Sequence, residues 1–217
     1  MNKVCVIGVG PGDDAFIAPA ARQKVAECDL ILGSERLTRL FDKPSQPLQL
    51  RGNPPHSIQF ILANRDRARI GVLVSGDPGL YSFMGTLSRF LGRDDYEVVP
   101  GISAVQLAFA RAKETWENAL ILSLHGRARG DLDDVVKRHA KLAVLTDDRW
   151  SPAALARYLL ERGLEDREFI VCQDLSYPGE RIWRGDVRSA AAEVFGEGAL
   201  SVVLVIDRKR CKGSFTA

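Results

Sequence analysis

Residues 72–82 read VLVSGDPGLYS, and this stretch decides the fold that we predict for the chain. The apolar run Val72–Val74 is typical of a buried strand. It ends in Ser75–Gly79, where two glycines, a proline and an aspartate favour a tight loop with exposed backbone N–H groups. Helix-compatible sequence resumes at Leu80. This order of elements indicates an open α/β sheet, which binds small molecules at the carboxyl ends of its strands; the alternative for this loop alone is a plain strand-to-helix turn.

Strands and helices alternate on both sides of this stretch. The alternation predicts an α/β fold whose first sheet is mainly parallel. The second sheet is expected to be mixed, because a hairpin joins the strands at 168–173 and 181–185. The other strands are expected at residues 4–9, 29–32, 96–99, 119–124, 142–146 and 200–206, and helices at 15–26, 34–41, 56–68, 80–91, 105–111, 131–139, 151–163 and 186–195.

The polar segment Lys113–Glu117 lies at the midpoint and marks the expected domain boundary. We therefore predict one domain over residues 1–113, a second over 117–209 and a short tail over 210–217. Residues 42–55 contain four prolines, and we expect an irregular loop there that can act as a lid. The basic tail from Asp207 is expected to fray.

The bulk composition is that of an ordinary soluble globular protein, with 46% hydrophobic and 27% charged residues. A formal net charge of +2 does not indicate a nucleic-acid partner. No apolar run approaches the ~20 residues of a membrane helix, and we expect neither a signal peptide nor a membrane partner. The cysteines and histidines lack the spacing of zinc ligands, so we expect no metal site and free thiols in a reducing cytoplasm.

The first strand ends in the loop Gly8–Asp13 (GVGPGD), which is similar to the dinucleotide-binding pattern G-x-G-x-x-G. Asp13 stands where that pattern has its third glycine, and Pro11 lacks the N–H that a pyrophosphate would use. These departures disfavour a nicotinamide-dependent dehydrogenase, which we keep as an alternative. Asp13 can instead cap a helix that begins near Ala15.

Four loops at strand ends, residues 10–13, 75–79, 100–104 and 125–127, carry the candidate chemistry, because the sequence has no nucleophile motif and no phosphate-binding P-loop. Such loops suit a flat or cationic small molecule held by backbone groups and one carboxylate. Asp77 supplies that carboxylate, with a turn hydrogen bond as the alternative. Ser103 can contact a ligand or only cap the helix that follows it.

Basic residues follow the fourth loop. Arg127 and Arg129 can grip carboxylates of a polyanionic substrate, and the alternative is a solvated surface. His125 can move a proton, although a histidine at a strand end is more often a satisfied turn residue.

Three of these motifs together, GVGPGD at 8–13, SGDPGLYS at 75–82 and VPGISAVQLAFA at 99–110, resemble the tetrapyrrole methylases that use S-adenosylmethionine. The resemblance covers about residues 3–206. PGISAVQLAFAR, LSLHGR and QDLSYPGERI resemble the branch that methylates C5 of precorrin-6Y or cobalt-precorrin-7. Where that activity is fused to a C15-methylating, decarboxylating domain, this chain would correspond to the N-terminal half only, and the C15 activity would lie on a separate protein or a missing half.

The resemblance implies a two-domain α/β fold with an active-site cleft between the domains, a homodimer, and S-adenosylmethionine as donor with S-adenosylhomocysteine as product. A tetrapyrrole trough is implied over the first domain, and Arg22 and Arg36 are further cations that can face it. The implied donor-binding residues are Pro11, Gly76, Asp77, Leu80, Ser103, Ala104, Thr146, Leu175 and Ser176; the substrate-binding residues are Gly10, Arg111, Arg127 and Arg129; and the candidate bases are Asp13 and His125.

The implied reaction is a direct in-line displacement, in which an electron-rich carbon attacks the donor methyl. It needs alignment and desolvation of the reactants more than an enzyme nucleophile. This agrees with a sequence that has glycine-rich loops at strand ends and no catalytic triad. The alternatives within the superfamily are a uroporphyrinogen methylase, a ribose methyltransferase on ribosomal RNA and a diphthine synthase. LSLHGR disfavours all three, and the charge of +2 disfavours RNA. A non-catalytic tetrapyrrole-binding module remains a further alternative.

Overall fold

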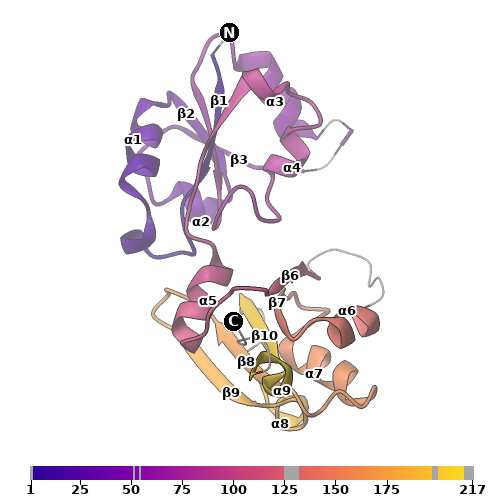
Figure 1. Cartoon of the computed structure of the whole chain (residues 1–217). Coiled ribbons are helices and arrows are strands. Elements are labelled where there is room, and N and C mark those ends of the chain that lie inside the picture. The colour runs from indigo at the N-terminus through magenta and orange to yellow at the C-terminus, as the bar shows by residue number, and fades with distance from the viewer. Residues whose placement is uncertain (1, 51, 54, 125–131, 197–199, 213–217) are drawn as a thin grey trace. The chain divides into compact units, whose positions relative to one another are not determined.

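The computed structural model describes residues 2–50, 52–53, 55–124, 132–196 and 200–212 (Figure 1). The chain forms two compact units, Met1–Ser103 and Ala104–Ala217, and each is described by itself. None of the helices in these ranges combines the length and the apolar character needed to cross a bilayer.

The first unit is built on a five-stranded sheet in the order β3-β2-β4-β1-β5, and every neighbouring pair is parallel. The predicted parallel sheet is therefore confirmed. The central strands are buried along their whole length, as expected for a parallel sheet covered on both faces. The strands are β1 (Val4–Gly8), β2 (Leu30–Gly33), β3 (Ser45–Pro47), β4 (Ile70–Val74) and β5 (Tyr96–Val99).

Alternate side chains of these strands enter two apolar clusters, because successive residues of a strand point to opposite faces. Val4, Val6 and Val72 pack with α3, whereas Ile7 and Leu73 pack with α1, so the two helices cover opposite faces (Figure 1). The helices of this unit are η1 (Asp14–Phe16), α1 (Pro19–Glu27), α2 (Glu35–Thr38), α3 (His56–Asn64), α4 (Met84–Leu87) and η2 (Arg93–Asp95).

Two expectations for this unit differ most from the structure. Within the expected irregular loop at 42–55, Ser45–Pro47 pairs with β2 as an edge strand, which tolerates Pro47 because one side of it needs no hydrogen bonds. The helix expected over 80–91 is only the short α4, since Tyr81 has a positive φ of 49° that interrupts a helix.

The second unit contains a mixed sheet in the order β6-β7-β10-β8-β9. Only β6 and β7 are parallel neighbours, and the other pairs are antiparallel, which confirms the predicted mixed sheet. The strands are β6 (Leu120–Ser123), β7 (Lys141–Leu145), β8 (Glu168–Gln173), β9 (Arg181–Asp186) and β10 (Ser201–Ile206); the helices are α5 (Ala104–Ala112), α6 (Leu132–Arg138), α7 (Pro152–Leu160), α8 (Val187–Ala192) and α9 (Arg208–Lys212).

The boundary between the units lies before α5, and not at Lys113–Glu117 as the sequence suggested. Helix α5 packs on β8 and β10 of the second unit, because Leu107, Ala108 and Phe109 on its apolar face are buried there. The tail also differs from expectation, since residues 208–212 form α9. Arg208 of that helix pairs with Glu114 and Glu168.

Candidate functional site

Three of the predicted loops meet at one edge of the first sheet. Strand β1 lies between β4 and β5, so the carboxyl ends of these three parallel strands are neighbours. The backbone N–H of Val9 donates to Val74 O at 3.0 Å, and the N–H of Gly76 donates to Gly10 O at 2.8 Å. The GVGPGD and SGDPG loops are therefore joined by backbone hydrogen bonds.

Gly8 and Gly101 allow the three loops to approach this closely. A Cβ atom at Gly8 would lie 2.7 Å from both Gly76 O and Gly101 N, and one at Gly101 would lie 2.3 Å from Gly76 O. No side chain fits at either position. Sequence reasoning did not single out these two glycines, although both lie in quoted motifs, because their role depends on contacts between separate loops.

Asp77 lies at the centre of this loop junction. Its Oδ1 accepts the N–H of Gly79 at 2.8 Å, and its Oδ2 accepts the N–H of Gly101 at 3.1 Å. The first bond is the turn alternative considered from sequence, and the second links the SGDPG loop to the PGIS loop. Each carboxylate oxygen retains a further lone pair that can accept from a ligand.

The other predicted residues of the first unit lie around the same edge. Pro11 is buried and Leu80 is half-buried, with its N–H donating to Asp77 O at 3.1 Å. Asp13 is exposed, and its Oδ1 accepts the N–H of Ala15 at 2.7 Å, which confirms the predicted helix cap at the start of η1. Ser103 is buried and directly precedes α5.

Gly10 has a φ of +77°, and a Cβ there would lie 2.7 Å from Phe16 O. The residue is buried, and its carbonyl is the acceptor for Gly76. Gly10 therefore has a structural role in the loop junction, independent of any contact with a ligand.

A cavity of about 360 Å³ opens at this edge of the first unit. Its walls are mostly apolar and include Leu48, Leu50 and Phe83, while Arg36 supplies a cation. Desolvation by the surrounding protein lowers the pKa of the Arg36 guanidinium, which nevertheless stays charged at neutral pH. An apolar cavity with a cation suits a flat ligand that carries carboxylates.

In the second unit, Thr146 and Leu175 lie at one edge of the mixed sheet, on either side of β10. Thr146 Oγ1 donates to Ser201 O at 3.1 Å, and the N–H of Asp174 donates to Leu200 O at 2.9 Å. Leu175 is buried between two residues with positive φ, Asp174 at 46° and Ser176 at 71°. Such backbone conformations are costly for non-glycine residues and are enriched in functional loops.

Arg111 and Ser176, which the sequence assigned to different ligands, contact the same carboxylate. Arg111 Nε lies 2.5 Å from Glu180 Oε1, and Glu180 Oε2 accepts the N–H of Ser176 at 2.7 Å. Sequence reasoning missed Glu180, because the pairing joins positions 69 residues apart. The only local indication of a role for Glu180 was its place in the motif QDLSYPGERI.

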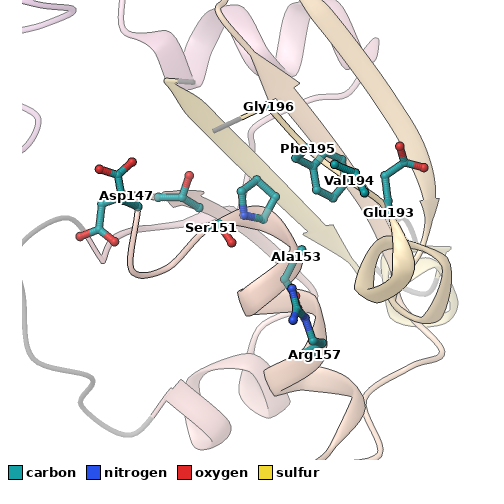
Figure 2. Close-up of a pocket in the computed structure, with 11 residues that line it drawn as sticks. Asp147, Ser151, Ala153, Arg157, Glu193, Val194, Phe195 and Gly196 are labelled. Carbon is teal, nitrogen blue, oxygen red and sulfur yellow. The ribbon is translucent and has the colours of Figure 1, made fainter. Parts of the chain in front are cut away.

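Thr146 also borders a cavity of about 530 Å³ in the second unit. Figure 2 shows Asp147 on one side of this cavity and Glu193 on the other, with Arg157 on α7 nearby. Asp147 Oδ1 accepts the N–H of Trp150 at 2.7 Å, and Glu193 pairs with Arg181 at 3.0 Å. Both carboxylates therefore already have partners within the protein itself.

The remaining predictions concern His125, Arg127 and Arg129, which lie outside the described residues. Arg22 pairs with Asp14 at 2.6 Å on the surface. Within the described ranges, no three His, Cys, Asp or Glu side chains are grouped so that they could hold a metal ion.

The sequence matches a family model described as Tetrapyrrole (Corrin/Porphyrin) Methylases over residues 3–191. Among curated proteins, it is 29% identical to the cobalt-precorrin-7 C(5)-methyltransferase of Salmonella typhimurium, over 94% of this chain and 98% of that protein. It is 30% identical to the decarboxylating precorrin-6Y C(5,15)-methyltransferase of Mycobacterium tuberculosis, over 88% of this chain and 48% of that protein.

Two solved structures share the fold. The precorrin-6Y methylase of Archaeoglobus fulgidus has a TM-score of 0.71 at 22% identity, and the alignment covers 94% of this chain and 97% of that one. The uroporphyrin-III C-methyltransferase of Thermus thermophilus, solved with S-adenosylhomocysteine, has a TM-score of 0.75 at 20% identity and coverages of 97% and 100%.

Proposed function

The chain belongs to the tetrapyrrole (corrin/porphyrin) methylases, and from this premise we propose that it is an S-adenosylmethionine-dependent C-methyltransferase of cobalamin biosynthesis. Its substrate is precorrin-6Y or cobalt-precorrin-7, which it methylates at C5. The observation that carries this proposal is the match to a cobalt-precorrin-7 C(5)-methyltransferase along nearly the whole length of both proteins.

The loop junction of the first unit supports a role in binding the methyl donor. Gly8 and Gly101 let the three loops pack closely together, and Asp77 retains acceptor capacity at their junction. We propose that Gly76, Asp77 and Leu80, with Pro11 and Ser103, contact the donor. Ala104, Thr146, Leu175 and Ser176 stay predictions from the family resemblance.

The cavity beside Arg36 supports a role in substrate binding. Its apolar walls suit a tetrapyrrole ring, and the guanidinium can pair with a carboxylate on the ring's edge. Gly10, Arg127 and Arg129 stay proposed contacts. Arg111 is a weaker candidate than the sequence suggested, because Glu180 already engages its guanidinium.

The donor carries its methyl group on a sulfonium, from which a neutral thioether departs as an excellent leaving group. The chain's own contribution is to hold the reactants aligned and to exclude water, and such alignment is worth about 7–11 kcal/mol. If the methylated carbon is to regain its conjugation with the ring, it must lose a proton. Asp13 and His125 are the proposed bases, and Asp13 is exposed at the end of the loop after β1.

We further propose that the protein acts in the cytoplasm as a homodimer, without nucleic acid. A second protein or domain would carry out C15 methylation and decarboxylation. The match to 48% of the bifunctional mycobacterial protein supports this division, since it is the share expected for one of two catalytic halves.

The decisive experiment combines donor binding with product analysis. Calorimetric titration with S-adenosylhomocysteine is expected to give micromolar affinity, and incubation with the precorrin substrate and isotopically labelled donor should place one methyl at C5 by NMR. A methyl at another carbon would assign the chain to a different branch of the family. Tetrapyrrole binding without S-adenosylhomocysteine binding would instead indicate a non-catalytic module.

A further inference from the structure

Two cysteines lie together at the amino-terminal edge of the first sheet, opposite the loop junction. Cys5 is in β1, and its pairing partner in the adjacent strand β4 is Gly71. Cys28, between α1 and β2, fills the space that a side chain at Gly71 would need, because a Cβ there would lie 2.9 Å from Cys28 Sγ. Both cysteines line the same small cavity, and Cys28 Sγ donates to Lys24 O at 3.2 Å.

The charges around the pair make the two thiols unequal. Cys5 Sγ donates to Glu97 Oε1 at 2.8 Å. The pKa of Cys5 is raised by its interaction with Cys28, by burial and by the Glu97 carboxylate. The pKa of Cys28 is lowered, first by its interaction with Cys5 and then by the cations of Lys43 and Lys24. Lys43 Nζ also donates to Cys28 O at 2.8 Å, which holds its charge beside the thiol. Cys28 is therefore the better nucleophile, and Cys5 remains protonated.

A small cavity gives access to both sulfur atoms. It has a volume of about 160 Å³, and its lining joins the two cysteines to charged side chains of both signs: Lys3, Lys24, Glu27, Arg69 and Glu97. Both cysteines are otherwise buried, at 6% and 2% exposure. A cavity of this volume is large enough for a molecule of the size of water or hydrogen peroxide.

We propose that Cys5 and Cys28 are a modification site at which a hydroperoxide oxidises the dithiol to a disulfide. The Cys28 thiolate attacks the peroxide, an S–O bond forms, the O–O bond breaks, and the leaving oxygen takes a proton. Cys5 then attacks the Cys28 sulfur of the sulfenic acid, forming the S–S bond while water leaves with the Cys5 proton. The thiols lose two electrons in total, and the peroxide gains them. This site is independent of methyl transfer.

The test uses the full-length reduced protein and hydrogen peroxide at pH 7.5. After quenching, the protein is alkylated in denaturant, digested without reductant and analysed by mass spectrometry. A peptide pair joined through Cys5 and Cys28 is expected. Cys172 is an internal control, because it is fully buried and burial raises its pKa to about 12, so it should stay alkylatable.

Two variants separate the roles of the thiols. In Cys5→Ser, a sulfenic acid on Cys28 should be trapped by dimedone, at a rate at least about tenfold above that of Cys172 because its thiolate fraction is higher. In Cys28→Ser, dimedone labelling of Cys5 should be absent over the same time. The proposal is overturned if Cys5 and Cys28 of the wild-type protein remain as alkylatable as Cys172 after peroxide, or if the linked peptide joins other cysteines.

Discussion

The carboxylate of Asp77 accepts the backbone N–H of Gly101 at 3.1 Å, and this bond spans 24 residues of sequence. It joins the SGDPG loop after β4 to the PGIS loop after β5, while Gly76 joins the same loop to the one after β1. One side chain thereby sets the distance between two motifs that sequence analysis could only treat separately.

Replacing Asp77 tests whether this junction binds the donor. Asp77→Ala removes both hydrogen bonds to Gly79 and Gly101, and bonds to a charged group are worth about 1.5–3 kcal/mol each. We expect the dissociation constant for S-adenosylhomocysteine to rise by at least about tenfold. Calorimetry measures this, and Asp166→Ala, which removes an exposed carboxylate that pairs with Lys209, is the control. Unchanged affinity in a folded Asp77→Ala protein would remove Asp77 from the donor site.

Gly101→Ala tests the close packing of the loops. The new Cβ would lie 2.3 Å from Gly76 O, so the backbone must move, at a cost of about 1–3 kcal/mol in unfolding free energy. Urea denaturation measures the loss. Gly85→Ala in α4 is the matched control, because nothing lies within 4 Å of its added Cβ and alanine favours a helix. Equal stabilities of the two variants would show that the loops can separate without cost.

Glu180→Gln tests whether the loop containing Ser176 serves the donor. The change removes the charge that pairs with Arg111 and weakens the hydrogen bond from the Ser176 N–H. That bond stabilises the backbone of Ser176, whose φ of 71° is unfavourable for a non-glycine residue. We expect KM for the donor to rise by about three- to tenfold while kcat stays within about twofold, since binding and not chemistry is affected. Glu165→Gln, which alters a surface pair with Arg188, is the control. A fall in kcat with an unchanged KM would contradict a positioning role.

Arg36→Gln separates the substrate cavity from the donor site. The side chain lines the cavity beside β4, where a carboxylate of the substrate would gain a charge-assisted bond. KM for the tetrapyrrole should rise by at least about tenfold, and S-adenosylhomocysteine affinity should not change. Arg39→Gln is the control, because Arg39 lies close by in sequence but pairs with Glu35 on the surface. Equal effects of the two substitutions would argue against this cavity as the substrate site.

Glu114 should contribute stability that depends on pH. Its hydrogen bond with Arg208 lowers the pKa of the Glu114 carboxyl below its usual value of 4.5 in the folded protein. The unfolded chain therefore binds the proton more readily, so the stabilisation is present above about pH 4.5 and is lost as the pH falls through the folded-state pKa. Urea denaturation should find Glu114→Gln less stable than wild type by about 1 kcal/mol at pH 7, and equal to it near pH 3. A difference that does not vary with pH would mean that Glu114 acts through packing alone.

Local signals in the sequence were sufficient for most elements of the fold. Strand β4, with its apolar run ended by SGDPG, and helix α7, with Ser151 as cap and Pro152 in its first turn, are specified by residues that are adjacent in the chain. The edge strand Ser45–Pro47 was not predictable, because proline-rich polar sequence forms a strand only where a neighbour such as β2 supplies the hydrogen bonds.

The sequence by itself determined the alternation of strands and helices, the parallel and mixed sheets, and the loops at strand ends whose motifs indicate the family. These properties follow from the spacing of apolar residues and from glycine and proline, which act over a few positions. Only the tertiary structure decided that Asp77 bonds to Gly101, that Glu180 joins Arg111 to Ser176, and that Cys28 lies beside Cys5. Each of these contacts joins residues distant in sequence, and tertiary packing within each unit, not local propensity, brings them together.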